Sequence, residues 1–204
     1  MISAAPAEAP DTTTPRSRIT ADGVDDATLV SRALGGDRWA HEAIFRRYVD
    51  DVLGLATRML GDASEADDVA QDTFTVALSR LERLEDRTRL RSWLIGIAVH
   101  RVRRRFRSRR WLRFVGMGGE GEIGLFELAS SSASPEVKAD LALIDGLLHT
   151  LPSEERIAWM LRAVEGEALE DIATITGASL ATVKRRIHAV EVRLGAMVGR
   201  GTSS

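Results

Sequence analysis

Apolar residues recur at helical spacing through the first half of the chain. A short helix is predicted to begin at Asp25-Asp26, where a carboxylate can cap it, and to end at the Gly35-Gly36 break. A second helix is predicted from about Asp37 to Gly61. Its apolar face comprises Phe45, Tyr48, Val49, Val52, Ala56 and Met59. This spacing indicates helices rather than strands.

Two further helices are predicted before residue 112. Ser64 stands three residues before Asp67, a variant of the capping box, and predicts the start of a helix with apolar inward positions. The next helix begins near Leu90, and its inward stripe is Trp93, Leu94, Ile97, Ala98, Val102 and Phe106. The other faces of that helix carry seven arginines and no acid within Val99–Trp111 (VHRVRRRFRSRRW).

Beyond this arginine-rich helix the periodic pattern stops. Residues 113–134 are rich in glycine and serine and are predicted to be a flexible linker. Residues 1–24 are rich in proline, alanine and threonine and are predicted to be a disordered tail. A second helical unit is predicted over 135–199, with one helix reaching about His149 and another opened by Pro152. The expected fold class is all-α, with two small helical domains joined by a flexible linker.

The segment Leu169–Ile187 (LEDIATITGASLATVKRRI) has the spacing of a helix-turn-helix motif. Ala173 is small where two helices cross, Gly177 suits the positive φ of the turn, and Val183 anchors the second helix. Ser179 is placed to cap that helix. The outward positions suit phosphates and guanine edges and are Thr182, Lys184, Arg185, Arg186 and His188. We favour DNA binding over the alternative, an αα-corner with a solvated basic face.

Composition and charge narrow the function classes. The chain has 204 residues, 44% of them hydrophobic and 28% charged, which is typical of a globular protein. It lacks cysteine, and its four histidines show no metal-ligand spacing, so we expect no metal and no cofactor. No apolar run is long enough to insert in a membrane. No nucleophile elbow, Walker loop or catalytic triad is recognisable.

The arginine cluster is unexpected because the net charge of the whole chain is −2. Like charges at helical spacing repel one another, and a polyanion relieves that repulsion. The alternative is a solvated helix end whose cations lie near a helix C-terminus. We favour nucleic acid as the partner of this cluster.

A helix with acids in its first two turns carries Asp67, Asp68, Gln71 and Asp72. Acids near a helix N-terminus complement the helix dipole, and these residues alone favour that interpretation. The other interpretation is a docking face for a basic partner.

Taken together, these residues resemble the extracytoplasmic-function (ECF) class of sigma factors in the sigma-70 family. Leu29–Asp62, Ser64–Leu78 and Arg91–Arg107 are similar to the segments of that family's region 2. Leu151–Leu194 is similar to its region 4. Two motif sets in the right order around a linker are more specific than a helix-turn-helix alone.

The resemblance implies a fold and a set of partners. Residues 25–112 would form a region 2-like domain and residues 135–199 a region 4-like domain. The implied partners are promoter DNA, core RNA polymerase through its β′ clamp and β flap, and an anti-sigma factor. Catalysis would belong to the polymerase, and the protein would act in the cytoplasm.

The resemblance also implies site residues. The acidic helix would dock on the polymerase clamp through Asp68, Gln71 and Asp72. The −10 element would be read and melted by Arg87, Arg89, Arg91, His100, Arg101, Arg103, Arg104 and Arg107. The −35 element would be read by Ser179, Thr182, Lys184, Arg185, Arg186 and His188.

The sequence also departs from the family pattern. His100 and Arg104 replace the family's usual Asn and Asp, and Ala189 and Glu191 replace common arginines. We therefore expect an atypical promoter. Two alternatives remain: a helix-turn-helix regulator that binds duplex DNA without polymerase, and an interaction module that sequesters a partner and binds no DNA.

Overall fold

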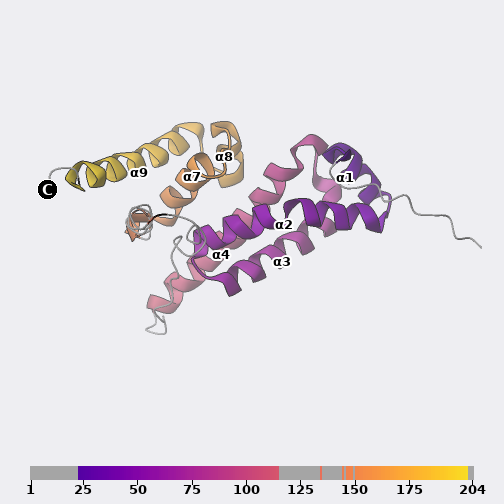
Figure 1. Cartoon of the computed structure of the whole chain (residues 1–204), viewed down its shortest axis with the longest axis horizontal. Coiled ribbons are helices and arrows are strands. Elements are labelled where there is room, and N and C mark those ends of the chain that lie inside the picture. Colours follow the sequence, from indigo (N-terminus) through magenta and orange to yellow (C-terminus); the bar gives the residue numbers. More distant parts are fainter. Residues whose placement is uncertain (1–22, 115–133, 135–143, 145, 149, 202–204) are drawn as a thin grey trace, which may run out of the picture.

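The computed structural model describes residues 23–114, 134, 144, 146–148 and 150–201 (Figure 1). Within these residues all regular structure is helical, which confirms the all-α prediction. The elements are α1 (Asp26–Leu34), α2 (Arg38–Leu60), α3 (Ala63–Ser79), η2 (Leu81–Arg83), η3 (Arg87–Arg89), α4 (Leu90–Phe114), α7 (Ser153–Ala163), α8 (Leu169–Thr176) and α9 (Leu180–Gly201). The predicted tail, the linker and the helix ending near His149 lie largely outside the described residues.

Most helix ends follow local backbone chemistry and agree with the prediction. Asp25 caps α1 by accepting a hydrogen bond from the backbone N–H of Thr28 at 2.9 Å. Asp37 caps α2 in the same way, and Gly61 ends α2 in the left-handed conformation, at φ 66°.

The predicted cap of α3 is wrong. Asp62, not Ser64, accepts the hydrogen bond from the backbone N–H of Glu65, at 2.9 Å, and the helix begins at Ala63. The reason is the backbone of Asp62, which is extended directly after the left-handed Gly61 and so has the non-helical geometry of a cap. Ser64 already lies inside the helix, where its side chain is exposed.

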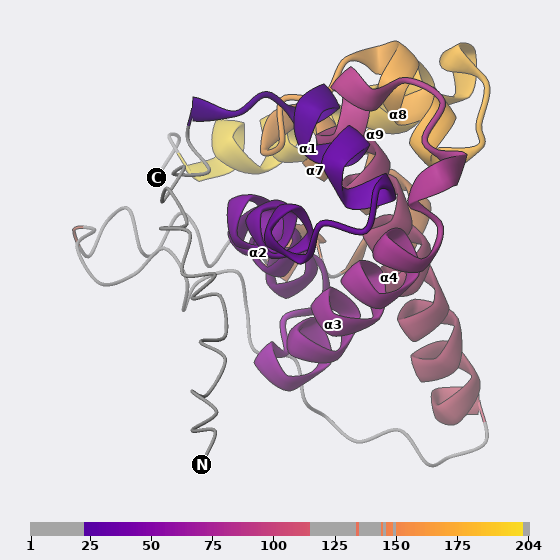
Figure 2. The ribbon, with the colours of Figure 1, turned by 90° about the vertical axis from the view of Figure 1, so that its right-hand side faces the viewer.

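The N-terminal unit is a bundle in which α2, α3 and α4 pack against one another and α1 packs on α2 (Figures 1 and 2). Its core is aliphatic, and Leu55, Met59 and Leu94 are almost completely buried. The last turns of α4 extend beyond the rest of this bundle (Figure 1). The arginine-rich end of α4 therefore has solvent on part of its circumference.

The C-terminal unit contains the predicted helix-turn-helix. Gly177 ends α8 at φ 62°, and the Ser179 hydroxyl accepts a hydrogen bond from the backbone N–H of Thr182 at the start of α9. Val183 is completely buried, as its predicted role as an anchor requires. A small separate apolar cluster contains Leu148, Leu151 and Val190.

The two units lie against each other. In the described residues α4 packs on α7 and α8, and α2 packs on α7 (Figure 1). Ile157, Leu161 and Ile172 of the C-terminal unit belong to the same apolar cluster as Leu94 of α4. A continuous core thus joins the units, and it determines which charged side chains meet.

Candidate nucleic-acid interface

The recognition helix α9 presents three of the predicted −35 residues to solvent. Lys184, Arg185 and His188 are exposed, and so is the capping Ser179 just before the helix, whereas Thr182 beside it is half-buried. Such an exposed basic face at the start of the second helix is the arrangement that contacts phosphates and base edges in a major groove.

Arg186 is directed differently from these neighbours. Its guanidinium is 3.2 Å from the carboxylate of Glu154 on α7, and the side chain is largely buried. Arg186 therefore stabilises the packing of α9 on α7 in this structure, and its predicted contact with DNA would require that ion pair to break.

One stripe of α4 remains open to solvent. His100, Arg104 and Arg107 are exposed and are spaced so that they share one face of the helix. Trp111 continues the stripe with 63% of its surface exposed. The sequence analysis did not identify Trp111 as part of this stripe. Its position one helical turn beyond Arg107 could have indicated that it lies on the same face of the helix.

The acidic face of α3 lies beside α4. Asp68 forms an ion pair with Arg105 at 3.0 Å, and Asp72 lies 3.9 Å from the guanidinium of Arg101. All three predicted polymerase-binding residues, including Gln71, are exposed. Ion pairs as exposed as these contribute at most about 1 kcal/mol, so a binding partner can displace them at low cost.

The predicted −10 residues just before α4 and in its first turn are engaged in contacts. Arg87 donates a hydrogen bond to the Ser31 hydroxyl at 2.6 Å, and Arg89 forms an ion pair with Asp171 of α8. Arg91 reaches the carboxylates of Asp51, Glu165 and Glu167. Those contacts measure 2.8, 3.1 and 2.6 Å respectively.

These contacts raise the pKa of Arg91 and so favour its charged form. Burial by itself lowers the pKa of Arg91, but the hydrogen bond that Arg91 donates to Asp51 and the charges of Asp51, Glu167 and Glu165 outweigh it, so the pKa is raised.

Arg103 is also held by the C-terminal unit. It donates hydrogen bonds to the Glu154 carboxylate at 2.5 Å and to the Thr176 carbonyl at 3.0 Å, and 12% of its side chain is exposed. The Thr176 carbonyl is at the C-terminal end of α8, where a cation is stabilised by the helix dipole. Arg89, Arg91 and Arg103 thus all contact the second unit, Arg103 with its side chain largely buried and Arg89 with its side chain still exposed.

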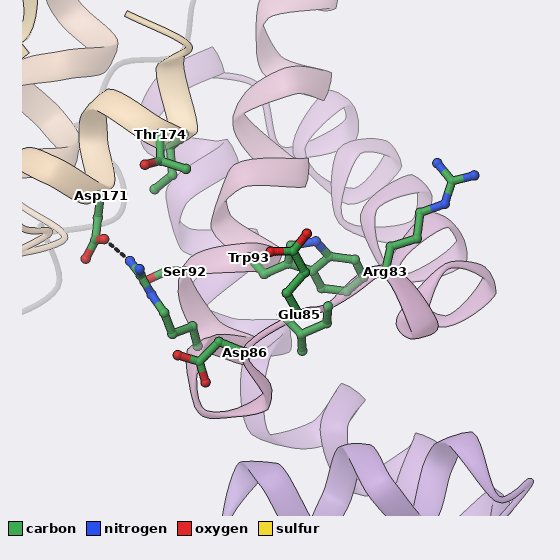
Figure 3. Close-up of a pocket in the computed structure, with 10 residues that line it drawn as sticks. Arg83, Glu85, Asp86, Ser92, Trp93, Asp171 and Thr174 are labelled. Atoms are coloured by element: carbon green, nitrogen blue, oxygen red, sulfur yellow. Dashed lines mark hydrogen bonds and ion pairs between the residues drawn. The ribbon is translucent and has the colours of Figure 1, made fainter. Parts of the chain in front are cut away.

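A cavity of about 260 Å³ lies between residues 83–93, which include the start of α4, and α8. Figure 3 shows Asp171 and Thr174 on one side of it and Trp93 with Glu85 on the other; the dashed line joins Asp171 to Arg89. Leu84, Trp93 and Ile175 are its apolar lining residues, and the other lining residues are polar or charged. Because α8 provides one wall, the cavity exists only while the two units are in contact.

Comparison with known proteins assigns this architecture to a family. Residues 44–112 match sigma-70 region 2, and residues 141–194 match sigma-70 region 4. The RNA polymerase sigma-H factor of Pseudomonas aeruginosa is 31% identical over 79% of this chain and 88% of its own length. The chain belongs to the ECF class of the sigma-70 family.

Other relatives agree with this assignment. The ECF RNA polymerase sigma factor SigW of Bacillus subtilis is 29% identical over 78% of this sigma factor and 89% of its own length. Among solved structures, CnrH in complex with the cytosolic domain of CnrY has the same fold, with a TM-score of 0.60 and 24% identity over 88% of this chain and 99% of that one. This sigma factor is a non-catalytic subunit that serves promoter recognition and transcription initiation.

The described part of the sigma factor contains neither a group of three or more side chains able to hold a metal nor a helix apolar and long enough to cross a bilayer.

Sequence reasoning missed the acids that hold the arginines of the sigma factor. Glu165, Glu167 and Asp171 stand in a loop and at a helix start with no motif around them. Nothing in the sequence pattern indicated them, because their role depends on how α8 packs against α4.

Proposed function

We propose that this sigma factor directs RNA polymerase to promoters by dividing the binding among three surfaces. The first is α9, which would enter the major groove of the −35 element with Lys184, Arg185 and His188. The observation that carries this proposal is their exposure on a capped helix-turn-helix. Ser179, Thr182 and Arg186 would complete the surface from the same helix end.

The second surface would bind the −10 element. It comprises the exposed stripe of α4 together with Arg89, Arg91 and Arg103, which contact the C-terminal unit. Arg87, which contacts Ser31, and Arg101, which lies beside Asp72, would complete it. The basic stripe of His100, Arg104 and Arg107 suits the backbone of separated strands. Because His100 and Arg104 replace the family's usual Asn and Asp, the promoter read here would be atypical.

The third surface is the acidic face of α3, through which Asp68, Gln71 and Asp72 would bind the β′ clamp of core RNA polymerase. Their exposure, and the weakness of the ion pairs that Asp68 and Asp72 make, support this role. Residues 25–112 and 135–199 would act as the two binding domains, with 113–134 as the linker between them. The C-terminal domain would also contact the β flap.

An anti-sigma factor is the remaining proposed partner. CnrH was solved with the cytosolic domain of CnrY, and the sigma factor RpoE of Bartonella quintana with the anti-sigma factor NepR. By analogy we infer that this chain has such a partner, and that it acts in the cytoplasm, where polymerase and DNA meet.

Run-off transcription with core polymerase and genomic promoter fragments tests the proposal. The wild-type chain is expected to remain bound to core polymerase and to start discrete transcripts. Asp68→Lys/Asp72→Lys is expected to abolish both, and Asp68→Asn/Asp72→Asn to weaken both without placing lysines opposite Arg101 and Arg105. Glu170→Lys, a reversal of an exposed acid on α8, is the control and should retain both activities.

The same experiment separates the alternatives. A helix-turn-helix regulator would bind promoter fragments without polymerase, and reversal of Asp68 and Asp72 would leave that binding intact. A partner-sequestering module would start no transcript, and its binding would not weaken steeply between low and moderate salt. Either result would contradict the proposed function.

A further inference from the structure

The helix α4 carries arginines on several sides, and those on two sides are paired with acids. Three pairs form a row along the side that faces α3, and they join Arg101 to Asp72, Arg105 to Asp68 and Arg109 to Glu65. On a second side, Arg103 pairs with Glu154 of α7 at 2.5 Å. An arginine paired with a carboxylate attracts a further anion less strongly, because the carboxylate offsets its charge.

A third side of α4 is basic and lacks such acids. His100, Arg104, Arg107 and Trp111 lie one helical turn apart in succession and are all exposed. These four residues, which we call the α4 stripe, extend over about 16 Å of helix. Within the residues that the structure describes, no ion pair involves Arg104 or Arg107. The positive charge of α4 is therefore least offset along this stripe.

The end of α4 that carries Trp111 is held in place by Arg109. Its guanidinium donates a hydrogen bond to the carbonyl oxygen of Leu60, the last residue of α2, at 2.9 Å. It also lies 3.2 Å from the carboxylate of Glu65 in the first turn of α3. Trp111 follows Arg109 by two residues and so lies about 200° further round the helix. The indole therefore points away from α2 and α3, on a helix end that is already ordered.

The exposure of Trp111 distinguishes it from the other tryptophans of the chain. Trp111 is 63% exposed, whereas Trp39, Trp93 and Trp159 are half-buried. An exposed aromatic ring beside a row of cations is the arrangement that binds single-stranded nucleic acid, in which the cations bind the phosphates and a base stacks on the ring. A base in a duplex is already stacked between its neighbours, so the ring has most to gain from an unpaired base.

The charge of the α4 stripe also distinguishes its partner from that of α3. The exposed face of α3 carries Asp68 and Asp72 and fits a basic partner, whereas the α4 stripe fits an anionic one. The two faces therefore suit partners of opposite charge, and nucleic acid is the polyanion that the proposed function brings to this domain.

We propose that Trp111 is a stacking site for an unpaired base of single-stranded DNA, whose neighbouring phosphates are bound by Arg104 and Arg107. This contact lies one helical turn beyond the residues that the family resemblance implies for the −10 element. It is independent of sequence, because every base offers a flat face. The inference rests on the proposed function for the identity of the strand, but the stacking site can be tested without polymerase.

Fluorescence anisotropy with the full-length chain tests the stacking site. The probe is a labelled random-sequence single strand of about 12 nucleotides, at low ionic strength. Trp111→Ala is expected to bind it about tenfold more weakly than wild type, and Trp111→Phe, which keeps an aromatic ring, to remain within about threefold. Leu34→Ala, which shortens an exposed apolar side chain at the end of α1, is the control and should bind as wild type does.

A second probe separates the base from the phosphates. A strand of the same length built from abasic sugars keeps every phosphate but has no base to stack. Trp111→Ala is expected to bind this strand as well as wild type does. Arg107→Gln is expected to weaken binding of both strands and to lower the slope of log K against log salt by about one. Arg46→Gln, an equal charge change on the exposed face of α2, should leave that slope unchanged.

Three results with these probes would overturn the proposal. One is an equal loss of affinity by Trp111→Ala for the strands with and without bases. Another is a larger loss for a duplex of the same sequence than for the single strand. The third is an affinity of Trp111→Ala for the single strand within about twofold of wild type.

Run-off transcription distinguishes failure of this proposal from failure of the proposed function. Trp111→Ala is expected to remain bound to core polymerase but to start fewer transcripts than wild type. Loss of polymerase binding with unchanged affinity for single-stranded DNA would assign Trp111 to a protein partner and overturn the stacking site. If the expected losses with the DNA probes are seen but wild type starts no transcript, the stacking site stands and the proposed function fails.

Discussion

Arg156 of α7 joins the two units through the end of α2. The residue is only 4% exposed. Its guanidinium donates hydrogen bonds to the carbonyl oxygens of Met59, at 2.5 Å, and of Arg58, at 3.3 Å. These carbonyls lie in the last turn of α2, where no further helical N–H can reach them. The guanidinium also lies 5.6 Å from the ring centre of Phe106 on α4.

The cost of replacing Arg156 with methionine follows from these contacts. Methionine preserves the apolar stem of the side chain but cannot donate hydrogen bonds. A hydrogen bond from a charged donor contributes about 1.5–3 kcal/mol, and the cation–π contact adds about 0.5–1 kcal/mol. We therefore expect Arg156→Met to lower the free energy of unfolding by about 2–4 kcal/mol, since it also leaves the Met59 carbonyl buried without its donor.

Equilibrium unfolding in urea, followed by tryptophan fluorescence and far-UV circular dichroism, measures this change. Arg46→Met is the matched control. Arg46 pairs with Glu42 on the exposed face of α2, so its replacement should cost at most about 0.5 kcal/mol. A stability of Arg156→Met within about 0.5 kcal/mol of wild type would refute the reasoning that α7 stabilises α2 through its terminal carbonyls.

Three further predictions concern single residues. Burial and a hydrogen bond to Asp26 raise the pKa of Tyr48, the only tyrosine, far above 10. Tyrosinate absorbance should therefore stay absent from the native protein up to about pH 11 but emerge near pH 10 in urea, and the free energy of unfolding should fall as the pH rises above 10, because the unfolded chain ionises first. Gly177→Ala should lower stability by about 1–2 kcal/mol in thermal unfolding, since φ is 62° there, and an unchanged melting temperature would contradict this. Asp62→Ala should cost about 1 kcal/mol through loss of the α3 cap while Ser64→Ala costs clearly less; equal costs would contradict the assignment of the cap.

Local features of the fold could be predicted from sequence because they depend on residues close in the chain. Asp25 and Asp37 cap helices through N–H groups two or three residues away, and Gly177 ends α8 through its own backbone freedom. The cap of α3 was misassigned because two candidate residues, Asp62 and Ser64, lie two positions apart. Only the observed backbone decides between them.

The candidate site was predictable in part for a related reason. The exposed face of α9 follows from helical periodicity once the buried positions, such as Val183, are known. The two motif sets also identified the family, which the matches to sigma-70 regions 2 and 4 confirm. The roles of individual DNA-binding and polymerase-binding residues remain predictions.

The sequence by itself determined the helices, the helix-turn-helix and the sigma-70 resemblance, because each depends on periodicity or on neighbouring residues. Only the tertiary structure decided that Arg91 and Arg103 face acids of the other unit while Arg104 and Arg107 face solvent. The chain carries 28 basic and 30 acidic residues, so a cation on α4 has many possible partners at any sequence distance. The partner it meets depends on how α7 and α8 pack against α2 and α4. The apolar core that the two units share determines this packing, and charge alone does not determine it.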